Sequence, residues 1–142
     1  MAKVLVLVDA AGDVVKKATL ELLTAARSLG EPAAVVLGRP GQAAALSDAL
    51  AEYGAATIYA VAGADFDQYL VAPKAEALAA VAAQATPAAV LVSSTAENKE
   101  IAARLAIKLG SGVLTDAVAV NADGSVEQSI FGGSITVTSK VR

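Results

Sequence analysis

Four short, continuously apolar runs alternate with segments of helical periodicity, and this alternation constrains the fold more than any other feature of the chain. The runs cover residues 4–8, 33–37, 57–61 and 89–92. Runs of this length suit strands that are buried on both faces, as in a parallel sheet covered by helices. The sequence therefore predicts an α/β fold built on a mostly parallel, doubly wound sheet.

Helical periodicity fills the intervals between the runs. We expect helices over residues 14–29, 42–53, 71–85 and 94–109, with Gly30, Gly54, Pro87 and Gly110 marking the points where they stop. The fourth helix carries the clearest start signal, Ser94-Thr-Ala-Glu97. In such a capping box, a Ser hydroxyl and the Glu97 carboxylate satisfy the free backbone N–H groups of the first turn.

Beyond Gly110 the pattern changes from helical to strand-like. Residues 113–120, 126–131 and 135–141 form three such runs, separated by turn-forming residues at 121–124 and 132–133. This arrangement predicts a C-terminal antiparallel β meander. The 142 residues fit one domain spanning 1–142, and because the chain stops within a strand pattern, we expect a further segment downstream.

Composition excludes several classes of function. The chain has no histidine and no cysteine, which removes the usual general base, thiolate nucleophiles and thiolate metal sites. With 11 basic and 14 acidic residues, it lacks the positive charge that nucleic-acid binding needs. We therefore predict no catalytic residue, no metal site and no nucleic-acid partner.

Membrane and export signals are equally weak. The long uncharged stretch at residues 77–96 is interrupted by Pro87 and by several hydroxyl side chains. The N-terminus enters a strand-like run directly and lacks the pattern of a signal or transit peptide. We expect a cytoplasmic protein without direct membrane insertion.

The residues that follow the apolar runs are the candidates for ligand binding, because ligands of parallel sheets bind beyond the carboxyl ends of the strands. These candidates are Asp9, Gly38, Ser93, Ser94 and Thr95. A nucleotide could place a ribose hydroxyl on Asp9 and a phosphate on the N–H groups of the fourth helix. The same hydroxyls also suit a helix cap, which is the favoured interpretation.

Other candidate motifs are less specific. Gly110-Ser-Gly112 lacks the third glycine of a dinucleotide-binding turn and precedes a strand instead of a helix. Asp65 and Asp67, close to Tyr69, are more typical of a solvated helix start than of a metal or acid pair. Neither pattern supports a site.

Several segments, taken in order, resemble the alpha subunits of electron transfer flavoproteins. They are Val4-Leu-Val-Leu-Val8, residues 21–30, Val35-Val-Leu-Gly38, residues 54–59, residues 87–96, residues 99–106, residues 110–116 and Phe131-Gly-Gly-Ser134. The match covers all 142 residues and corresponds to the N-terminal domain. The chain departs from the family pattern at Asn98, Lys99 and Ala103, where Gly, Arg and Pro are common.

The resemblance implies a fold shared with adenine nucleotide alpha hydrolase-like and universal-stress-type domains. It also implies an FAD-carrying heterodimer of alpha and beta subunits. Such proteins pass electrons from acyl-CoA and related dehydrogenases, as in fatty acid beta-oxidation, to a membrane quinone oxidoreductase, and they are carriers and not enzymes. In the family, the FAD is held chiefly by a C-terminal domain that is absent from this chain, and AMP is held by the beta subunit. No FAD or AMP ligand is therefore expected here.

What remains for this domain is a role as a scaffold and as the interface with the beta subunit. The Val-rich, charge-poor residues 113–131 are the expected contact, with Val118, Val126 and Phe131 as candidates. One alternative is a free-standing universal-stress-type module that binds AMP or ATP at Asp9, Gly38 and the Ser93 loop. A second alternative, an enzyme active alone, has almost no titratable groups to use.

Overall fold

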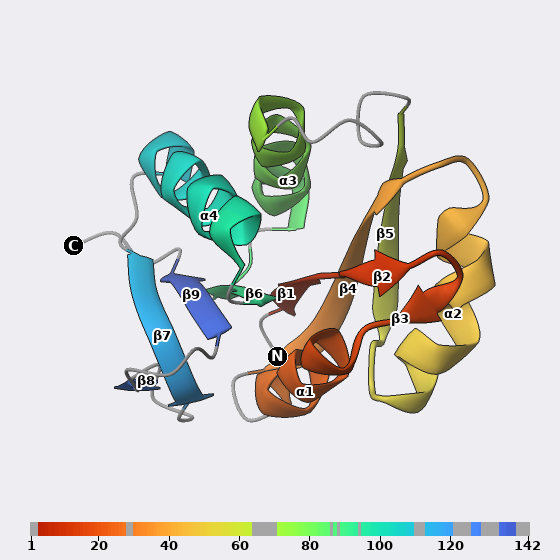
Figure 1. The fold of residues 1–142 in the computed structure, drawn as a ribbon, viewed down its shortest axis with the longest axis horizontal. Coiled ribbons are helices and arrows are strands. Elements are labelled where there is room, and N and C mark those ends of the chain that lie inside the picture. The colour runs from red at the N-terminus through yellow and green to blue at the C-terminus, as the bar shows by residue number, and fades with distance from the viewer. Residues whose placement is uncertain are drawn as a thin grey trace.

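The computed structural model describes residues 3–27, 30–63, 71–85, 87, 89–93, 95–109, 113–120, 126–128 and 134–138. Figure 1 shows a twisted sheet with helices on both of its faces. The elements follow one another as β1 (Lys3–Leu7), β2 (Ala10–Ala11), β3 (Val14–Val15), α1 (Lys17–Ala26), β4 (Glu31–Gly38), α2 (Gln42–Glu52), β5 (Thr57–Ala62), α3 (Val71–Ala85), β6 (Ala89–Ser93), α4 (Ala96–Leu109), β7 (Val113–Val120), β8 (Val126–Gln128) and β9 (Ser134–Thr138).

The four predicted apolar runs form the parallel part of the sheet, in the order β5-β4-β1-β6. β1 lies at its centre, pairing with β4 on one side and with β6 on the other. β6 is buried at every residue and β1 at all but its first. The predicted α/β class and parallel sheet are therefore confirmed, for the reason that two-sided burial requires continuous apolar sequence.

The C-terminal strands are antiparallel, as predicted, but their order differs from that of a simple meander. β9 pairs with β6 over five residues and also with β7, which gives the complete order β5-β4-β1-β6-β9-β7-β8. The last strand thus inserts beside the parallel strands instead of following β8. The expected turns at residues 121–124 and 132–133 lie outside the described residues.

Two apolar layers hold the helices on the sheet. Successive strand residues point to opposite faces, so Val4 and Val6 face one layer while Leu5 and Leu7 face the other. The first layer includes Leu22, Leu23, Leu46 and Leu50 of α1 and α2, and the second includes Leu78, Val81, Ile101 and Leu105 of α3 and α4. Each fully buried Leu or Ile contributes about 1.5–3 kcal/mol to folding.

The first helix begins later than predicted. Residues 10–15 form a small hairpin of β2 and β3, in which Ala10 faces Val15 and Ala11 faces Val14. Gly12 adopts a φ of 61°, a left-handed conformation that a tight hairpin turn needs. The Gly12-Asp13 dipeptide between two apolar pairs is a hairpin signal, and the prediction of a helix from Val14 was wrong because it overlooked this turn.

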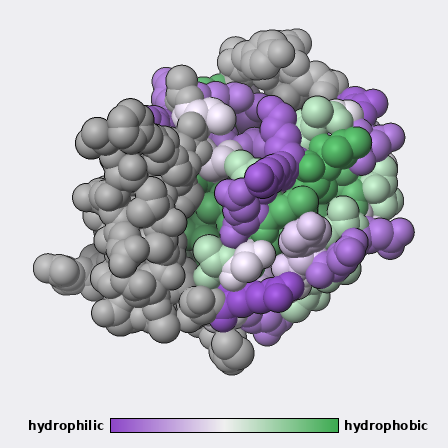
Figure 2. All heavy atoms as spheres, turned by 60° about the horizontal axis from the view of Figure 1, so that its bottom comes forward, coloured by the Kyte–Doolittle hydropathy of each residue, from purple (hydrophilic) through white to green (hydrophobic). Residues whose placement is uncertain are grey.

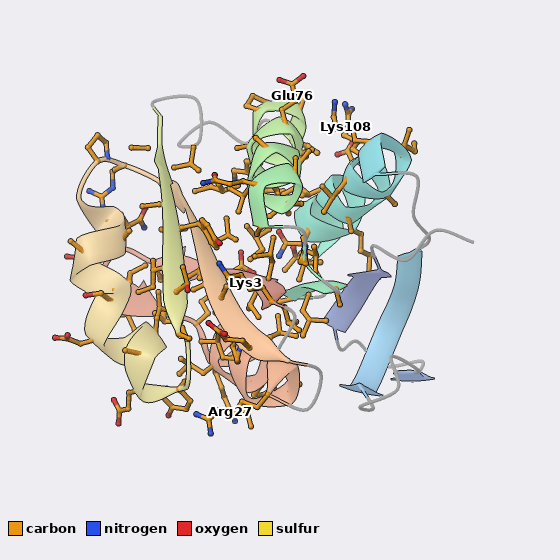
Figure 3. All side chains as sticks on the ribbon, turned by 180° about the vertical axis from the view of Figure 1, so that it is seen from behind. Lys3, Arg27, Glu76 and Lys108 are labelled. Atoms are coloured by element: carbon orange, nitrogen blue, oxygen red, sulfur yellow. The ribbon has the colours of Figure 1, made fainter. Side chains whose placement is uncertain are left out.

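A polar contact joins β1 to β5 across β4. Lys3 Nζ donates a hydrogen bond to the Tyr59 hydroxyl at 2.8 Å and lies 5.3 Å from the centroid of the Tyr59 ring. Figure 3 labels Lys3 in the view of the molecule from behind. The hydrogen bond is the largest influence raising the pKa of Lys3, and the negative charge of Glu31 raises it further.

The surface of the described part of the chain is mostly mixed in polarity. Figure 2 shows hydrophobic patches interleaved with hydrophilic residues on the face that comes forward when the bottom of Figure 1 is turned towards the viewer. The large hydrophobic side chains that stay exposed are Val14, Tyr53 and Ile107. Within the described ranges, no helix has both the length and the apolar character needed to cross a bilayer.

Candidate functional site at the carboxyl edge of the sheet

The carboxyl ends of β1 and β6 meet where the winding of the sheet reverses. From β1 the chain winds outward through β4 to β5, and it then returns to place β6 on the opposite side of β1. In open α/β sheets, ligands bind at this kind of reversal. Asp9 follows β1 and Ser93 ends β6, so the topology brings two of the predicted site residues together.

Asp9, Ser93 and Asn98 form a polar triad at this point. The Ser93 hydroxyl donates a hydrogen bond to Asp9 Oδ2. Asn98 Nδ2 donates to the same Asp9 oxygen at 2.8 Å and to Ser93 Oγ at 3.0 Å. Ser93 and Asn98 are buried, so these bonds replace the water that their polar atoms lose on folding. The triad thus uses the protein's own side chains to fill the reversal point.

The backbone of Asp9 is held as firmly as its side chain. Its N–H donates to Thr19 Oγ1 at 2.8 Å, and its carbonyl oxygen accepts a bond from the Lys16 N–H at 2.9 Å. Thr19 is fully buried in the first turn of α1. Two independent anchors therefore fix where the Asp9 carboxylate points.

The start of α4 differs by one residue from the predicted capping box. Thr95 Oγ1 accepts the backbone N–H of Asn98 at 3.0 Å, so Thr95 caps the helix. Glu97 Oε1 lies 2.6 Å from Lys74 Nζ and joins α4 to α3. Ser94 lies outside the described residues. The cap interpretation of these hydroxyls is therefore confirmed for Thr95.

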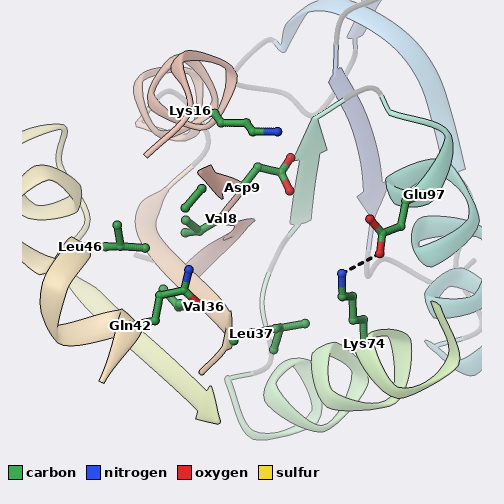
Figure 4. Close-up of a pocket in the computed structure, with 11 residues that line it drawn as sticks. Val8, Asp9, Lys16, Val36, Leu37, Gln42, Leu46, Lys74 and Glu97 are labelled. Carbon is green, nitrogen blue, oxygen red and sulfur yellow. Dashed lines mark hydrogen bonds and ion pairs between the residues drawn. The ribbon is translucent and has the colours of Figure 1, made fainter. Parts of the chain in front are cut away.

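A cavity of about 330 Å³ opens beside the triad at the same edge. Figure 4 shows Lys16 and Asp9 on one side of it and the Lys74–Glu97 pair on the other. The lining residues are Val8, Asp9, Ala10, Lys16, Val36, Leu37, Gly38, Gln42, Leu46, Lys74 and Glu97. Asp9 and Gly38 thus line one shared cavity.

Gly38 contributes by allowing a close approach of Gln42. A Cβ at position 38 would collide with the Gln42 side-chain amide. That amide accepts the Arg39 N–H at 3.2 Å and donates to the Gly12 carbonyl at 3.2 Å. The glycine therefore permits a bridge between the start of α2 and the β2–β3 hairpin, at the rim of the cavity.

The charges that line the cavity are balanced. Asp9 and Glu97 supply carboxylates, while Lys16 and Lys74 supply ammonium groups, of which Lys74 is paired with Glu97. No group of three or more acidic side chains within the described ranges could hold a metal ion. The arrangement can bind a small polar molecule through hydrogen bonds.

The cavity at the carboxyl edge of the sheet does not fit a flavin dinucleotide. The cavity lies at the small end of the roughly 300–1,000 Å³ that pockets for drug-sized ligands occupy, and a dinucleotide such as FAD is larger than these ligands. The turn after β1 contains one glycine, Gly12, where a dinucleotide-binding turn has three. Neither feature of this edge suits FAD.

Sequence reasoning found Asp9, Gly38, Ser93 and Thr95 but missed Asn98. A polar residue in the first turn of a helix usually caps it or faces solvent, so nothing in the pattern indicates that Asn98 is buried and completes the triad. The lysines and Gln42 were also missed, because each depends on how separate helices meet. Asp65, Asp67 and Tyr69 lie outside the described residues, as does Phe131.

Comparison with known proteins agrees with the resemblance seen in the sequence. The sequence model of the electron transfer flavoprotein domain matches residues 4–142. The chain is 53% identical over 137 residues to the electron transfer flavoprotein subunit alpha of Mycobacterium tuberculosis, and 49% identical to that of Mycobacterium leprae, covering 96% of this chain and 43% of each relative. The alpha subunit of Syntrophomonas wolfei is 34% identical over 123 residues, which cover 84% of this chain and 38% of that protein. The chain therefore spans less than half the length of these relatives, and it belongs to the electron transfer flavoprotein domain family.

Proposed function

We propose that this chain is the N-terminal scaffold of the alpha subunit of a heterodimeric electron transfer flavoprotein, an electron carrier. The observation that carries this proposal is the 49–53% identity to two proteins named as alpha subunits, over 96% of the chain. We further propose that acyl-CoA and related dehydrogenases supply the electrons, that a quinone oxidoreductase receives them, and that the protein is cytoplasmic.

FAD supplies the redox chemistry in such a carrier. Because the cavity at the carboxyl edge does not fit a dinucleotide, we place FAD in a part of the protein beyond these residues. The described residues then act as a rigid body, with the sheet, two helical layers and the polar triad fixing its shape. We also propose that AMP binds to the beta subunit and not to this chain.

The beta-subunit interface is proposed at the C-terminal strands. Val118 lies in β7 and Val126 in β8, and these strands form the end of the sheet opposite to β5. Residues 113–131 carry only three charged residues, Asp116, Asp123 and Glu127, and this low charge suits a buried protein contact. Phe131 is part of the proposed contact.

Co-purification tests the interface. The chain is co-expressed with a beta subunit, as the wild type and as Val118→Arg and Val126→Arg variants. Val14→Arg, on an exposed residue of the β2–β3 hairpin, is the control. We expect the two strand variants to lose the beta subunit while circular dichroism shows retained fold, and the control to keep it. Unimpaired assembly of both strand variants would refute this location.

Intact mass and absorbance test the carrier assignment. Residues 1–142 mixed with a beta subunit are expected to form a colourless complex. The longer protein mixed with the same beta subunit is expected to show the absorbance bands of flavin. A yellow complex formed by residues 1–142 would contradict the placement of FAD elsewhere.

A nucleotide-binding module is the second candidate, favoured by one observation, the shared cavity that Asp9 and Gly38 line. Calorimetric titration of the chain with AMP and with ATP tests it. Binding that is lost in an Asp9→Asn variant would support this candidate, and the absence of heat with either nucleotide would remove it.

A further inference from the structure

The hairpin of β2 and β3 lies between β1 and α1, at the carboxyl edge of the sheet. Its two strands pair with each other and form a small sheet of their own. The base of the hairpin lines the cavity, because Ala10 begins the hairpin and Lys16 follows it, and both are lining residues. The tip reaches across to Gln42, a third lining residue, at the start of α2. The hairpin therefore spans the cavity from the α1 side to the α2 side (Figure 4).

The base of the hairpin is firmly anchored. The Lys16 N–H donates to the Asp9 carbonyl oxygen at 2.9 Å, and the Asp9 N–H donates to the buried Thr19 hydroxyl at 2.8 Å. Val15 is 8% exposed and packs into the apolar layer that contains α1 and α2. Movement of the hairpin is therefore confined to its tip.

The tip, residues 11–14, is held much more loosely. All four residues are exposed, and Val14 is 68% exposed. A Cβ added at Gly12 would meet no atom within 4 Å beyond its chain neighbours. An ion pair at 3.9 Å joins Asp13 to Arg39, and both side chains are more than half exposed. Segments with few buried apolar contacts are the ones that open at low free energy.

One hydrogen bond closes the span between the tip and α2. Gln42 Nε2 donates to the Gly12 carbonyl oxygen at 3.2 Å, across 30 positions of the chain. Gln42 Oε1 is held locally, because it accepts the Arg39 N–H at 3.2 Å within the same turn. When the tip moves, the bond to Gly12 therefore breaks while Gln42 keeps its local partner.

We propose that residues 11–14 are a strap over the carboxyl-edge cavity, which opens when the Gln42–Gly12 bond breaks while the base of the hairpin stays fixed. Opening separates the tip from α2 and lets a molecule reach the inner lining of the cavity, which includes Val36. Gating of the cavity goes beyond both candidate functions. It is tested without a ligand, so its outcome is independent of theirs.

Introduced thiols measure strap opening, because the chain has no cysteine of its own. Val36→Cys places a thiol on the cavity lining, at a position that is 4% exposed. Ala34→Cys is the matched control, on the same strand and in the same apolar layer but outside the lining. Ala103→Cys, at an exposed position of α4, gives the rate of an unprotected thiol. Each variant is reacted with a maleimide, and labelling is followed by intact mass.

Urea separates strap opening from global unfolding. Opening of four residues exposes little surface, so the labelling rate of Val36→Cys should stay nearly constant at low urea concentrations. It should be slower than that of Ala103→Cys and faster than that of Ala34→Cys. The rate of Ala34→Cys should rise steeply with urea, because labelling there requires global unfolding.

Loosening the strap should raise the urea-independent labelling rate of Val36→Cys. Gln42→Ala removes the hydrogen bond to the tip and should raise this rate about two- to tenfold. Asp13→Asn removes the ion pair of the tip without altering a lining side chain, and should raise the rate up to about fivefold at low salt. Ser47→Ala removes a side-chain hydrogen bond of 2.9 Å elsewhere on α2 and should leave the rate unchanged.

Three results would overturn the proposal. The first is labelling of Val36→Cys at the same rate and with the same urea dependence as Ala34→Cys, and the second is labelling as fast as that of Ala103→Cys. The third is a urea-independent rate that neither loosening variant raises, or that the Ser47→Ala control raises equally. If Val36→Cys does not fold, Leu46→Cys on the buried lining repeats the test, with Leu50→Cys on the same helix as its control.

Discussion

Replacing Asn98 by alanine removes the buried amide that completes the polar triad. The amide donates one hydrogen bond to the Asp9 carboxylate at 2.8 Å and another to the Ser93 hydroxyl at 3.0 Å. A bond to a charged acceptor contributes about 1.5–3 kcal/mol and a neutral one about 0.5–1.5 kcal/mol. The higher helix propensity of alanine offsets about 0.6 kcal/mol of this loss in the free energy of unfolding. We therefore expect the free energy of unfolding to fall by about 1.4–3.9 kcal/mol.

Urea unfolding followed by circular dichroism measures this loss. With an m value of about 2 kcal/mol/M, the urea midpoint should fall by about 0.7–2 M at an unchanged slope. The control is Glu100→Ala on the same helix, which breaks an exposed Arg104 pair at 3.5 Å and should cost at most about 0.5 kcal/mol. A loss for Asn98→Ala no larger than that of the control would show that the triad contributes nothing to stability.

Three further changes probe other contacts. Lys3→Met removes the ammonium group whose pKa is raised by the hydrogen bond to Tyr59. The stabilisation from this group is present below pH 10.5 and disappears as the pH rises through the raised pKa. The free energies of unfolding of wild type and variant, measured in urea, should therefore become equal at strongly alkaline pH. The free energy of unfolding should fall by about 1 kcal/mol in Gly38→Ala and in Gln42→Ala, because each variant breaks the same bridge to the hairpin. A double-mutant cycle tests this, since the double variant should lose hardly more than either single variant. Lys74→Met should cost about 1 kcal/mol, and much of that loss should persist at high salt, since the ion pair with Glu97 is partly buried.

The sequence was sufficient to predict the parallel strands and three of the four helices. Strands such as β6 are buried on both faces, so every residue of the strand must be apolar or nearly so, and this produces a continuous apolar run in the sequence. The order of the C-terminal strands was not predictable in the same way, because antiparallel runs look alike whether the last strand follows β8 or pairs with β6. Strand pairing over this distance depends on tertiary packing, which local periodicity does not report.

The candidate site was predictable in its location but only partly in its members. The rule for parallel sheets places Asp9 and Gly38 at the carboxyl edge, and both line the cavity there. The roles of the hydroxyls were harder to assign, since Ser93 binds Asp9 while Thr95 caps α4. Asn98 belongs to the site because α4 docks against the end of β1, a contact between residues 89 positions apart.

The central position of β1 has a consequence for synthesis. Its second neighbour, β6, begins 85 residues later, where Ala89 pairs with Val4. At about 5–20 residues per second on the ribosome, roughly 4–17 s pass before that neighbour is made. Throughout this interval the β6-facing edge of an apolar strand stays open, and the Asp9 carboxylate lacks Ser93 and Asn98, which lie 84 and 89 residues further along the chain. Nascent chains of this domain should therefore depend on chaperone protection until α4 has left the exit tunnel.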